Sequence, residues 1–236
     1  MSGIGARVSG MNDTITPISP SDFHATEGLE DWRVLGDGAY AHYRTADLAA
    51  SARFVQAIAG VSGPAGHPPA IDLRPGGVTI RLITAGDDFM GMTGADVEAG
   101  RAISRLARES GLEADPSAVQ HLLVVPGAPA GVEIMPFWRA ILGYQSRPDS
   151  PDEDLVDPRD RDPAFWFESM DDPRPDGGGA IHIAVWLPEG QAEARVAAAL
   201  AAGGRMVRDA SAPSWWTLAD AAGNEADVAT VSGRDW

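Results

Sequence analysis

The sequence predicts an α+β protein with two domains, and two observations lead to this fold class. Short stretches of strand length, rich in Val, Ile and Leu, alternate with longer helical stretches along the chain. The order of these elements differs between the halves: the first half follows an αββαββα pattern, and the second half contains a βαβββ pattern twice. A chain of 236 residues with 44% hydrophobic residues can form two such cores.

The first half begins with a helix and a pair of strands. Ser19 followed directly by a proline is typical of a helix start, because Ser caps free N–H groups and Pro fits the first turn. Residues 32–44 predict two strands around a Gly-Asp-Gly turn. Either Thr45 or Asp47 then begins an Ala-rich helix that continues to about Ala59.

A second strand pair and a helix complete the first half. The strands are expected at 70–74 and 78–84. Thr93 and Asp96 have the spacing of a capping box, in which each side chain accepts a hydrogen bond from the other residue's backbone N–H. They predict the start of a helix that Gly111 ends, since glycine readily adopts the left-handed conformation found at helix ends.

The second half repeats one order of elements, a strand, a helix and further strands. The expected ranges are 119–125, 130–142 and 164–170 in the first copy, and 180–187, 189–202, 205–208, 214–219 and 225–231 in the second.

These patterns divide the chain into four segments. Residues 1–17 are interpreted as a disordered lead-in, residues 18–112 as the first domain, residues 113–118 as a linker and residues 119–236 as the second domain.

Composition excludes several classes of function. The formal net charge of −16 disfavours binding to nucleic acid or to an anionic membrane surface. The chain has no cysteine, and all 18 of its basic residues are arginine, which excludes thiolate and Schiff-base chemistry. Residues 1–20 lack the apolar core that a signal peptide needs, so we expect none, and no apolar stretch approaches the roughly 20 residues of a membrane span. We therefore expect a cytoplasmic protein that acts on a small molecule.

Several motifs of the first half occur in the order found in one enzyme family. They are Phe54-Val55, Gly66-His67-Pro68-Pro69, Ile71-Asp72-Leu73-Arg74, Val78-Thr79-Ile80-Arg81-Leu82, Thr84 and Met92-Thr93-Gly94-Ala95-Asp96. On these motifs, residues 19–112 resemble the pterin-4a-carbinolamine dehydratases. The resemblance implies that family's fold for the whole unit.

The same resemblance implies an incomplete catalytic site. The family's signature is His-His-Pro with a later Thr-His; this chain retains His67 but has Pro68 and Ala85 in place of the other two histidines. Imidazoles carry protons well near neutral pH, whereas proline and alanine side chains carry none. We expect a fold kept for packing, dimerisation or ligand binding, with His67-dependent dehydratase activity as an alternative.

Motifs of the second half point to another family. They are Pro136-Phe137-Trp138-Arg139-Ala140-Ile141-Leu142-Gly143-Tyr144, Ile181-His182-Ile183, Trp216-Thr217-Leu218-Ala219-Asp220 and Gly223-Asn224-Glu225. On these motifs, residues 118–236 resemble the vicinal oxygen chelate superfamily of glyoxalase-like and bleomycin-resistance-like proteins. The resemblance implies paired βαβββ modules in a half-open barrel with a metal in its groove.

That resemblance implies metal ligands on the first and last strands of each module. His121, Glu168, His182 and Glu225 occupy those positions. Two imidazoles and two carboxylates suit a divalent Ni, Zn, Mn, Fe or Co ion. The alternative for each residue is an ordinary structural histidine or a solvated glutamate.

Strand alternation supports His182 independently of the resemblance. In residues 180–187 the odd-numbered positions form an apolar face, so His182 shares the other face with Ala184 and Trp186. Glu168 likewise shares a face with Trp166.

The function expected from these residues is metal-dependent chemistry in the second domain, by a lyase, isomerase or dioxygenase acting on a small metabolite with neighbouring oxygens. Glu225 or Glu168 would act as the base. The alternatives are a 4a-hydroxytetrahydrobiopterin dehydratase that uses His67, and a non-catalytic protein that sequesters a planar ligand. Both resemblances imply a homodimer.

Overall fold

The computed structural model describes residues 16–61, 68–86, 88–170, 180–219, 221 and 223–234. The lead-in expected at 1–17 therefore lies almost wholly outside the described residues, as does His67. Within the described ranges, no helix is long and apolar enough to cross a membrane.

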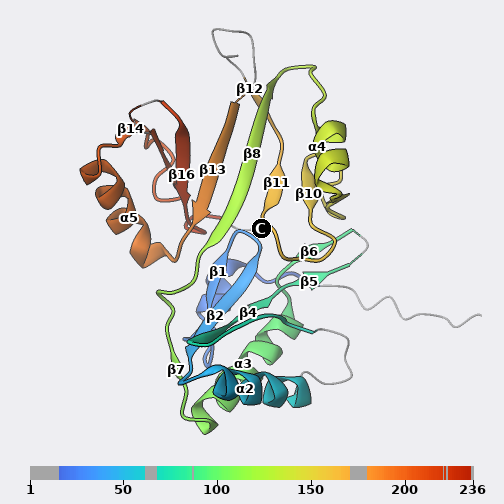
Figure 1. The fold of residues 1–236 in the computed structure, drawn as a ribbon, viewed down its shortest axis with the longest axis vertical. Coiled ribbons are helices and arrows are strands. Elements are labelled where there is room, and N and C mark those ends of the chain that lie inside the picture. Colours follow the sequence, from blue (N-terminus) through green and yellow to red (C-terminus); the bar gives the residue numbers. More distant parts are fainter. Residues whose placement is uncertain are drawn as a thin grey trace, which may run out of the picture.

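The first domain has the expected order of elements with three short strands added (Figure 1). Its elements are α1 (Pro20–His24), β1 (Arg33–Leu35), β2 (Gly38–Arg44), α2 (Leu48–Val61), β3 (Ala70–Arg74), β4 (Gly77–Leu82), β5 (Thr84–Ala85), β6 (Met90–Gly91), α3 (Gly94–Glu109) and β7 (Glu113–Ala114). The main sheet has the order β1-β2-β4-β3, and β7 pairs with β2. The segment expected as a linker thus begins with a strand of the first domain's sheet.

The helix starts of the first domain form as the sequence predicts. The Ser19 side chain accepts a hydrogen bond from the Asp22 backbone N–H at 3.1 Å. Thr93 and Asp96 form the capping box of α3, and the Asp96 carboxylate accepts the Thr93 N–H at 2.7 Å. These bonds satisfy N–H groups that have no partner inside a helix.

One face of the first domain's sheet is covered and the other is polar. Alternate residues of β2 and β4 are buried with residues of α2 and α3, and these strand residues are Ala39, Ala41, Tyr43, Val78, Ile80 and Leu82. Tyr40 and Arg81, which alternate with them, lie on the opposite face.

The second domain contains the βαβββ order twice, as expected. The first copy comprises β8 (His121–Pro129), α4 (Met135–Leu142), β9 (Gln145–Ser146), β10 (Asp154–Val156), β11 (Ala164–Trp166) and β12 (Glu168–Met170). The second comprises β13 (Ala180–Trp186), α5 (Glu189–Ala201), β14 (Arg205–Arg208), β15 (Trp215–Ala219) and β16 (Glu225–Ala229). In the first copy the last strand is divided at Phe167, whose N–H donates to the Glu153 carbonyl.

All strands of the second domain belong to one sheet of order β14-β15-β16-β13-β8-β11-β10-β9, with β12 also paired to β8. The two copies meet at the antiparallel pair of β8 and β13. Residues of α5 pack on Trp216, Leu218 and Val228, and residues of α4 lie in a cluster with Leu155 and Phe165. Both helices therefore cover the same face of the sheet, which leaves the other face for a site.

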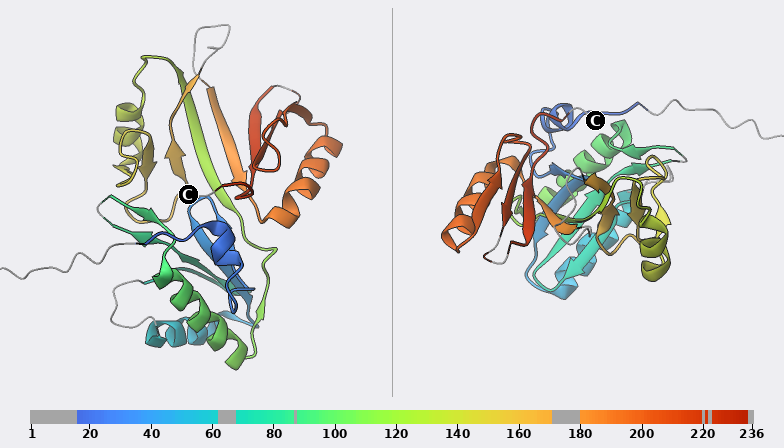
Figure 2. Two further views of the ribbon diagram at one scale, coloured as in Figure 1. Left: turned by 180° about the vertical axis from the view of Figure 1, so that it is seen from behind. Right: turned by 90° about the horizontal axis from the view of Figure 1, so that it is seen from above.

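The two domains share one apolar core. Val125, Ala184, Trp186 and Ala229 of the second domain belong to the same buried cluster as the core of the first domain. In both side views the β1–β2 hairpin lies against one end of the β8–β13 pair (Figures 1 and 2). The domains are packed together and are not merely linked in sequence.

Candidate functional site

Strand register determines which side chains project from the uncovered face of the second domain's sheet, which we call the inner face. His182 lies opposite Val125, and Glu168 lies opposite Gly127. Asp227 lies beside Ala184. Because paired residues project to the same side and side chains alternate along a strand, His182, Glu168, Asp227 and Glu225 all belong to the inner face.

The imidazole of His182 lies between two carboxylates. Its Nε2 atom is 3.3 Å from Oδ2 of Asp227, and its Nδ1 atom is 3.7 Å from Oε1 of Glu168. The first distance allows a hydrogen bond, whereas the second exceeds one. Asp227 therefore holds the ring while Glu168 stays free to approach another group.

These neighbours shift the pKa values of both residues. The hydrogen bond to Asp227 raises the pKa of His182, against the effect of burial, and the charges of Glu168 and Glu225 add to the rise. Burial raises the pKa of Glu168, and the charges of Asp227 and Glu225 raise it further against His182 and Arg208. A carboxyl of raised pKa beside an imidazole of raised pKa is a pair suited to moving protons near neutral pH.

Two further features shape the inner face. The second oxygen of Asp227, Oδ1, is buried and has no hydrogen-bond partner within the described part of the chain. At Gly127, a Cβ atom would lie 2.8 Å from Cγ of Met170 and 3.5 Å from Cγ of Glu168. The absence of a side chain at residue 127 therefore lets the β12 side chains lie across β8.

His121, one of the four expected ligands, lies apart from this cluster in the structure. It lies opposite Trp186, four residues along β8 from Val125, the residue that faces His182. Four residues of strand span about 13 Å. Its Nδ1 atom instead lies 3.2 Å from Oδ1 of Asp37 in the first domain. The β8 residue that lies opposite His182 is thus an apolar valine.

As arranged, the inner-face residues offer too few metal ligands. Nε2 of His182 faces Asp227, so a metal would bind the ring through Nδ1 and could share Glu168, whose Oε1 lies 3.7 Å from that atom. In the ranges that the structure describes, no three His, Asp or Glu side chains are grouped closely enough to hold a metal. Glu225 is exposed at the start of β16, and its charge raises the pKa of both His182 and Glu168.

The first domain's expected site is described only in part. Thr84 donates a hydrogen bond to the Asp96 carboxylate at 2.8 Å and contacts Thr93, so it supports the start of α3. Ala85 pairs with Met90 in the β5–β6 hairpin. His67 lies outside the described residues.

Two functional candidates were missed in the sequence. Asp227 stands two residues after Glu225, and strand alternation alone would have placed it on the same face. Asp37 stands in the Gly-Asp-Gly turn, and nothing in the sequence near it indicates that it meets His121.

Comparison with protein-family models matches each half of the chain separately. Residues 16–106 match the model described as pterin 4 alpha carbinolamine dehydratase, and residues 123–229 match a glyoxalase-like domain. Among curated proteins, no relative gives a significant match. The glyoxalase-like match begins after His121 and includes Glu168, His182 and Asp227.

Proposed function

Because the chain joins a pterin-carbinolamine-dehydratase domain to a glyoxalase-like domain, we propose that it is an acid–base enzyme whose chemistry occurs on the inner face of the second domain. The substrate would be a small metabolite with neighbouring oxygens, and the reaction an isomerisation or a lyase step. The observation that carries this proposal is the position of the His182 imidazole between Glu168 and Asp227.

Glu168 is the proposed base. Its pKa is raised by burial, which moves it closer to neutral pH and makes its carboxylate a better proton acceptor. Its nearest imidazole nitrogen is 3.7 Å away, so no tight ion pair has to be broken before Glu168 takes a proton. The proton would come from a substrate carbon that carries a hydroxyl group and neighbours a carbonyl.

His182 is the proposed acid. Its raised pKa keeps a proton on the ring near neutral pH, and that proton can move to the substrate oxygen as negative charge develops there. Asp227 orients the ring through its contact with Nε2, which leaves Nδ1 to face the substrate. Asp227 is therefore a positioning residue.

The two groups together give a balanced proton transfer. Glu168 takes the carbon-bound proton, the electron pair forms a carbon–carbon double bond, and His182 protonates the former carbonyl oxygen. In an isomerisation, a proton returns to the former carbonyl carbon while His182 takes the proton of the original hydroxyl, whose oxygen becomes the new carbonyl. In a lyase reaction, the enediol loses an O–H proton to His182, the carbonyl re-forms, and the β-substituent leaves with its bonding electrons and takes up the proton held by Glu168.

A metal-dependent form of this reaction demands more of the site. His182 and Glu168 would supply two ligands, and a further protein ligand would have to come from a residue other than His121. A dioxygenase needs a facial set of two histidines and a carboxylate, for which His121 is too far along β8. The geometry therefore favours acid–base chemistry, and metal dependence is a separate question for elemental analysis of the purified chain.

The test measures exchange of carbon-bound hydrogen. The full chain is incubated in D₂O with a panel of small α-hydroxycarbonyl compounds, and loss of each C–H signal is followed by NMR. We expect Glu168→Gln to slow exchange by at least about 100-fold, the usual contribution of a general base. Glu109→Gln, an exposed change at the end of α3, is the matched control.

Other outcomes would replace this proposal. Exchange that is unaffected by Glu168→Gln would exclude it. Binding of a planar ligand without turnover would favour the sequestering protein. Turnover of a carbinolamine pterin that His67→Ala abolishes would favour the dehydratase. Stoichiometric transition metal that is lost in His182→Ala and Glu225→Ala would restore the metal-dependent form.

A further inference from the structure

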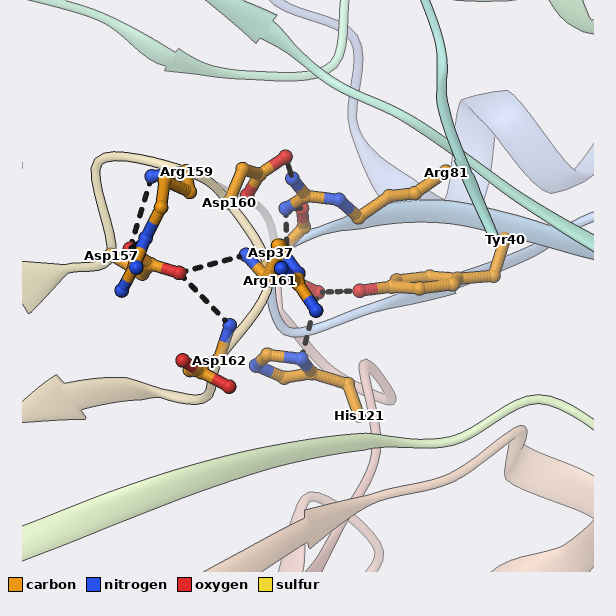
Figure 3. Close-up of polar contacts among 9 residues, drawn as sticks. All are labelled: Asp37, Tyr40, Arg81, His121, Asp157, Arg159, Asp160, Arg161 and Asp162. Carbon is orange, nitrogen blue, oxygen red and sulfur yellow. Dashed lines mark hydrogen bonds and ion pairs between the residues drawn. The ribbon is translucent and has the colours of Figure 1, made fainter. Parts of the chain in front are cut away.

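A second imidazole–carboxylate pair lies at the boundary between the domains, apart from the inner-face site. His121, at the start of β8, meets Asp37 in the turn between β1 and β2 (Figure 3). Nδ1 of the histidine is 3.2 Å from Oδ1 of the aspartate. Each domain contributes one member, so the pair exists only because the two domains are packed together.

Asp37 is held in place by two other residues of the first domain. The Tyr40 hydroxyl donates a hydrogen bond to it at 2.7 Å, and the Arg81 guanidinium donates one at 2.8 Å. Arg81 is only 10% exposed in its side chain. An acceptor fixed by two donors orients the imidazole that it contacts, as the third group does in a catalytic triad.

The environment of His121 keeps its ring neutral. Burial lowers the pKa of His121, and the positive charges of Arg81 and Arg147 lower it further. Asp37 and Asp160 oppose this shift without reversing it. A neutral ring that faces a carboxylate through Nδ1 carries its proton on that atom, so the lone pair is on Nε2.

Nε2 of His121 is available. No residue in the described ranges offers it a hydrogen bond, and it is not one of the buried side-chain atoms that lack a partner there. Solvent therefore reaches this atom, although the side chain as a whole is only 11% exposed. The lone pair of an oriented, neutral imidazole is thus left without a protein donor in the described ranges.

A short loop between β10 and β11 borders this pair. The Asp157 carboxylate accepts hydrogen bonds from the backbone N–H groups of Arg159, Arg161 and Asp162, which fixes the shape of the loop (Figure 3). Asp160 contacts Arg81 and has a positive φ of 56°. Its side chain is 55% exposed, and contacts of such exposed groups are weak. Asp160 thus links the loop to Arg81 of the first domain through an exposed side chain.

We propose that His121 and Asp37 form a second acid–base site, in which Nε2 of His121 accepts a proton from a weakly acidic O–H or N–H group of a small ligand at the domain boundary. The proton moves from the ligand heteroatom to Nε2, the electron pair stays on that heteroatom, and Asp37 stabilises the imidazolium formed. The loop around Asp160 controls access. None of the residues involved belongs to the inner-face site.

Diethyl pyrocarbonate tests this proposal, because it acylates unprotonated, accessible imidazole nitrogens. The full chain is treated at neutral pH, and modification of each histidine is followed by peptide mass spectrometry. We expect His121 to react in the wild type. Asp160→Asn removes the charge on the Arg81 contact while keeping a residue that tolerates positive φ, so His121 should react severalfold faster.

Asp37→Asn should act in the opposite direction. An asparagine amide that donates to Nδ1 would move the ring proton to Nε2, and the rate at His121 should fall by at least about tenfold. His182→Gln, which lies in the other site, should leave the rate at His121 unchanged. Circular dichroism confirms that each variant is folded.

One result overturns the proposal. If His121 stays unmodified in both the folded wild type and Asp160→Asn, its Nε2 is not accessible and the pair only holds the domains together. Equal rates in the wild type and Asp37→Asn would likewise exclude orientation by the aspartate. Neither result affects the C–H exchange that tests the inner-face site, so each of the two proposals can be excluded without excluding the other.

Discussion

Gly36 lies against the indole ring of Trp186, so closely that a Cβ atom at residue 36 would be 2.7 Å from Cε2 of the ring. Gly36 belongs to the β1–β2 turn of the first domain, and Trp186 ends β13 in the second. This contact and the shared core around it make the two domains a single packing unit.

Gly36→Val should therefore destabilise the whole chain. The added side chain would collide with a buried indole, and overpacking of this kind costs about 1–3 kcal/mol. Denaturant unfolding followed by circular dichroism measures the loss. Gly76→Ala is the matched control, since a Cβ atom there would meet nothing within 4 Å, and its effect should stay within about 0.5 kcal/mol.

Arg81 should contribute far more than a surface arginine. Arg81→Met leaves Asp37 with one donor fewer at a mostly buried position, and breaking such a pair costs about 3–5 kcal/mol. Arg74→Met breaks a pair whose arginine side chain is 75% exposed, which costs about 0–1 kcal/mol. Equal losses in urea unfolding would show that Arg81 has no special role at the boundary.

The raised pKa of His182 gives stability a definite dependence on pH. A histidine whose pKa is higher in the folded than in the unfolded chain stabilises the fold fully below its ordinary value of 6.5. That contribution is lost as the pH rises through the folded-state pKa. In His182→Gln, the free energy of unfolding should no longer decrease over this pH range. His42→Gln is the control, in which that decrease should persist, and denaturant unfolding at a series of pH values measures both.

Glu168 contributes in the same direction but at lower pH. Its carboxyl is more easily protonated in the folded chain, so stability decreases as the pH rises above the ordinary value of 4.5. Glu168→Gln should remove that part of the slope and also diminish the part due to His182, because the charge of Glu168 adds to the raised pKa of that histidine. NMR titration of the side-chain carboxyl carbon checks the direction of the shift.

Gly127→Ala should damage the inner face more than the fold. The new methyl group would displace Met170 and then Glu168, both of which lie over residue 127. We expect the free energy of unfolding to decrease by about 1–3 kcal/mol, so that the chain still folds. The rate of C–H exchange in the substrate should decrease strongly in the protein that remains folded. Gly131→Ala is a poor comparison because Gly131 has a positive φ of 82°, so Gly190→Ala, with open space around it, serves as the control.

Local signals in the sequence predicted most of the fold. Ser19, Thr93 and Gly111 give helix ends through bonds that each makes within a few residues, so the sequence around them is sufficient. The alternation in β13 correctly separated His182 from its apolar neighbours. Such features depend on contacts between residues close in sequence.

The failures concern contacts between distant residues. The first strand of the second domain was expected at 119–125 and forms at 121–129, and the pairing of His182 with Val125 depends on a register that no local pattern encodes. His121 is a histidine on the strand where a metal ligand is expected, but it lies four residues from Val125, the position opposite His182. The meeting of Asp37 with His121 depends on domain packing, which has no local signature at either residue.

The β1–β2 hairpin of the first domain packs at one end of the inner face and therefore limits the size of ligand that can bind there. Val125, Ala184 and Ala229 are packed against the first domain, so the part of the inner face around Glu168, Gly127 and Glu225 is what remains for a ligand. Residues of the first domain therefore help to set the size of the ligand that the second domain can accept. If the two domains were separated, more of the inner face would be uncovered, and we expect the isolated second domain to be less selective for its ligand.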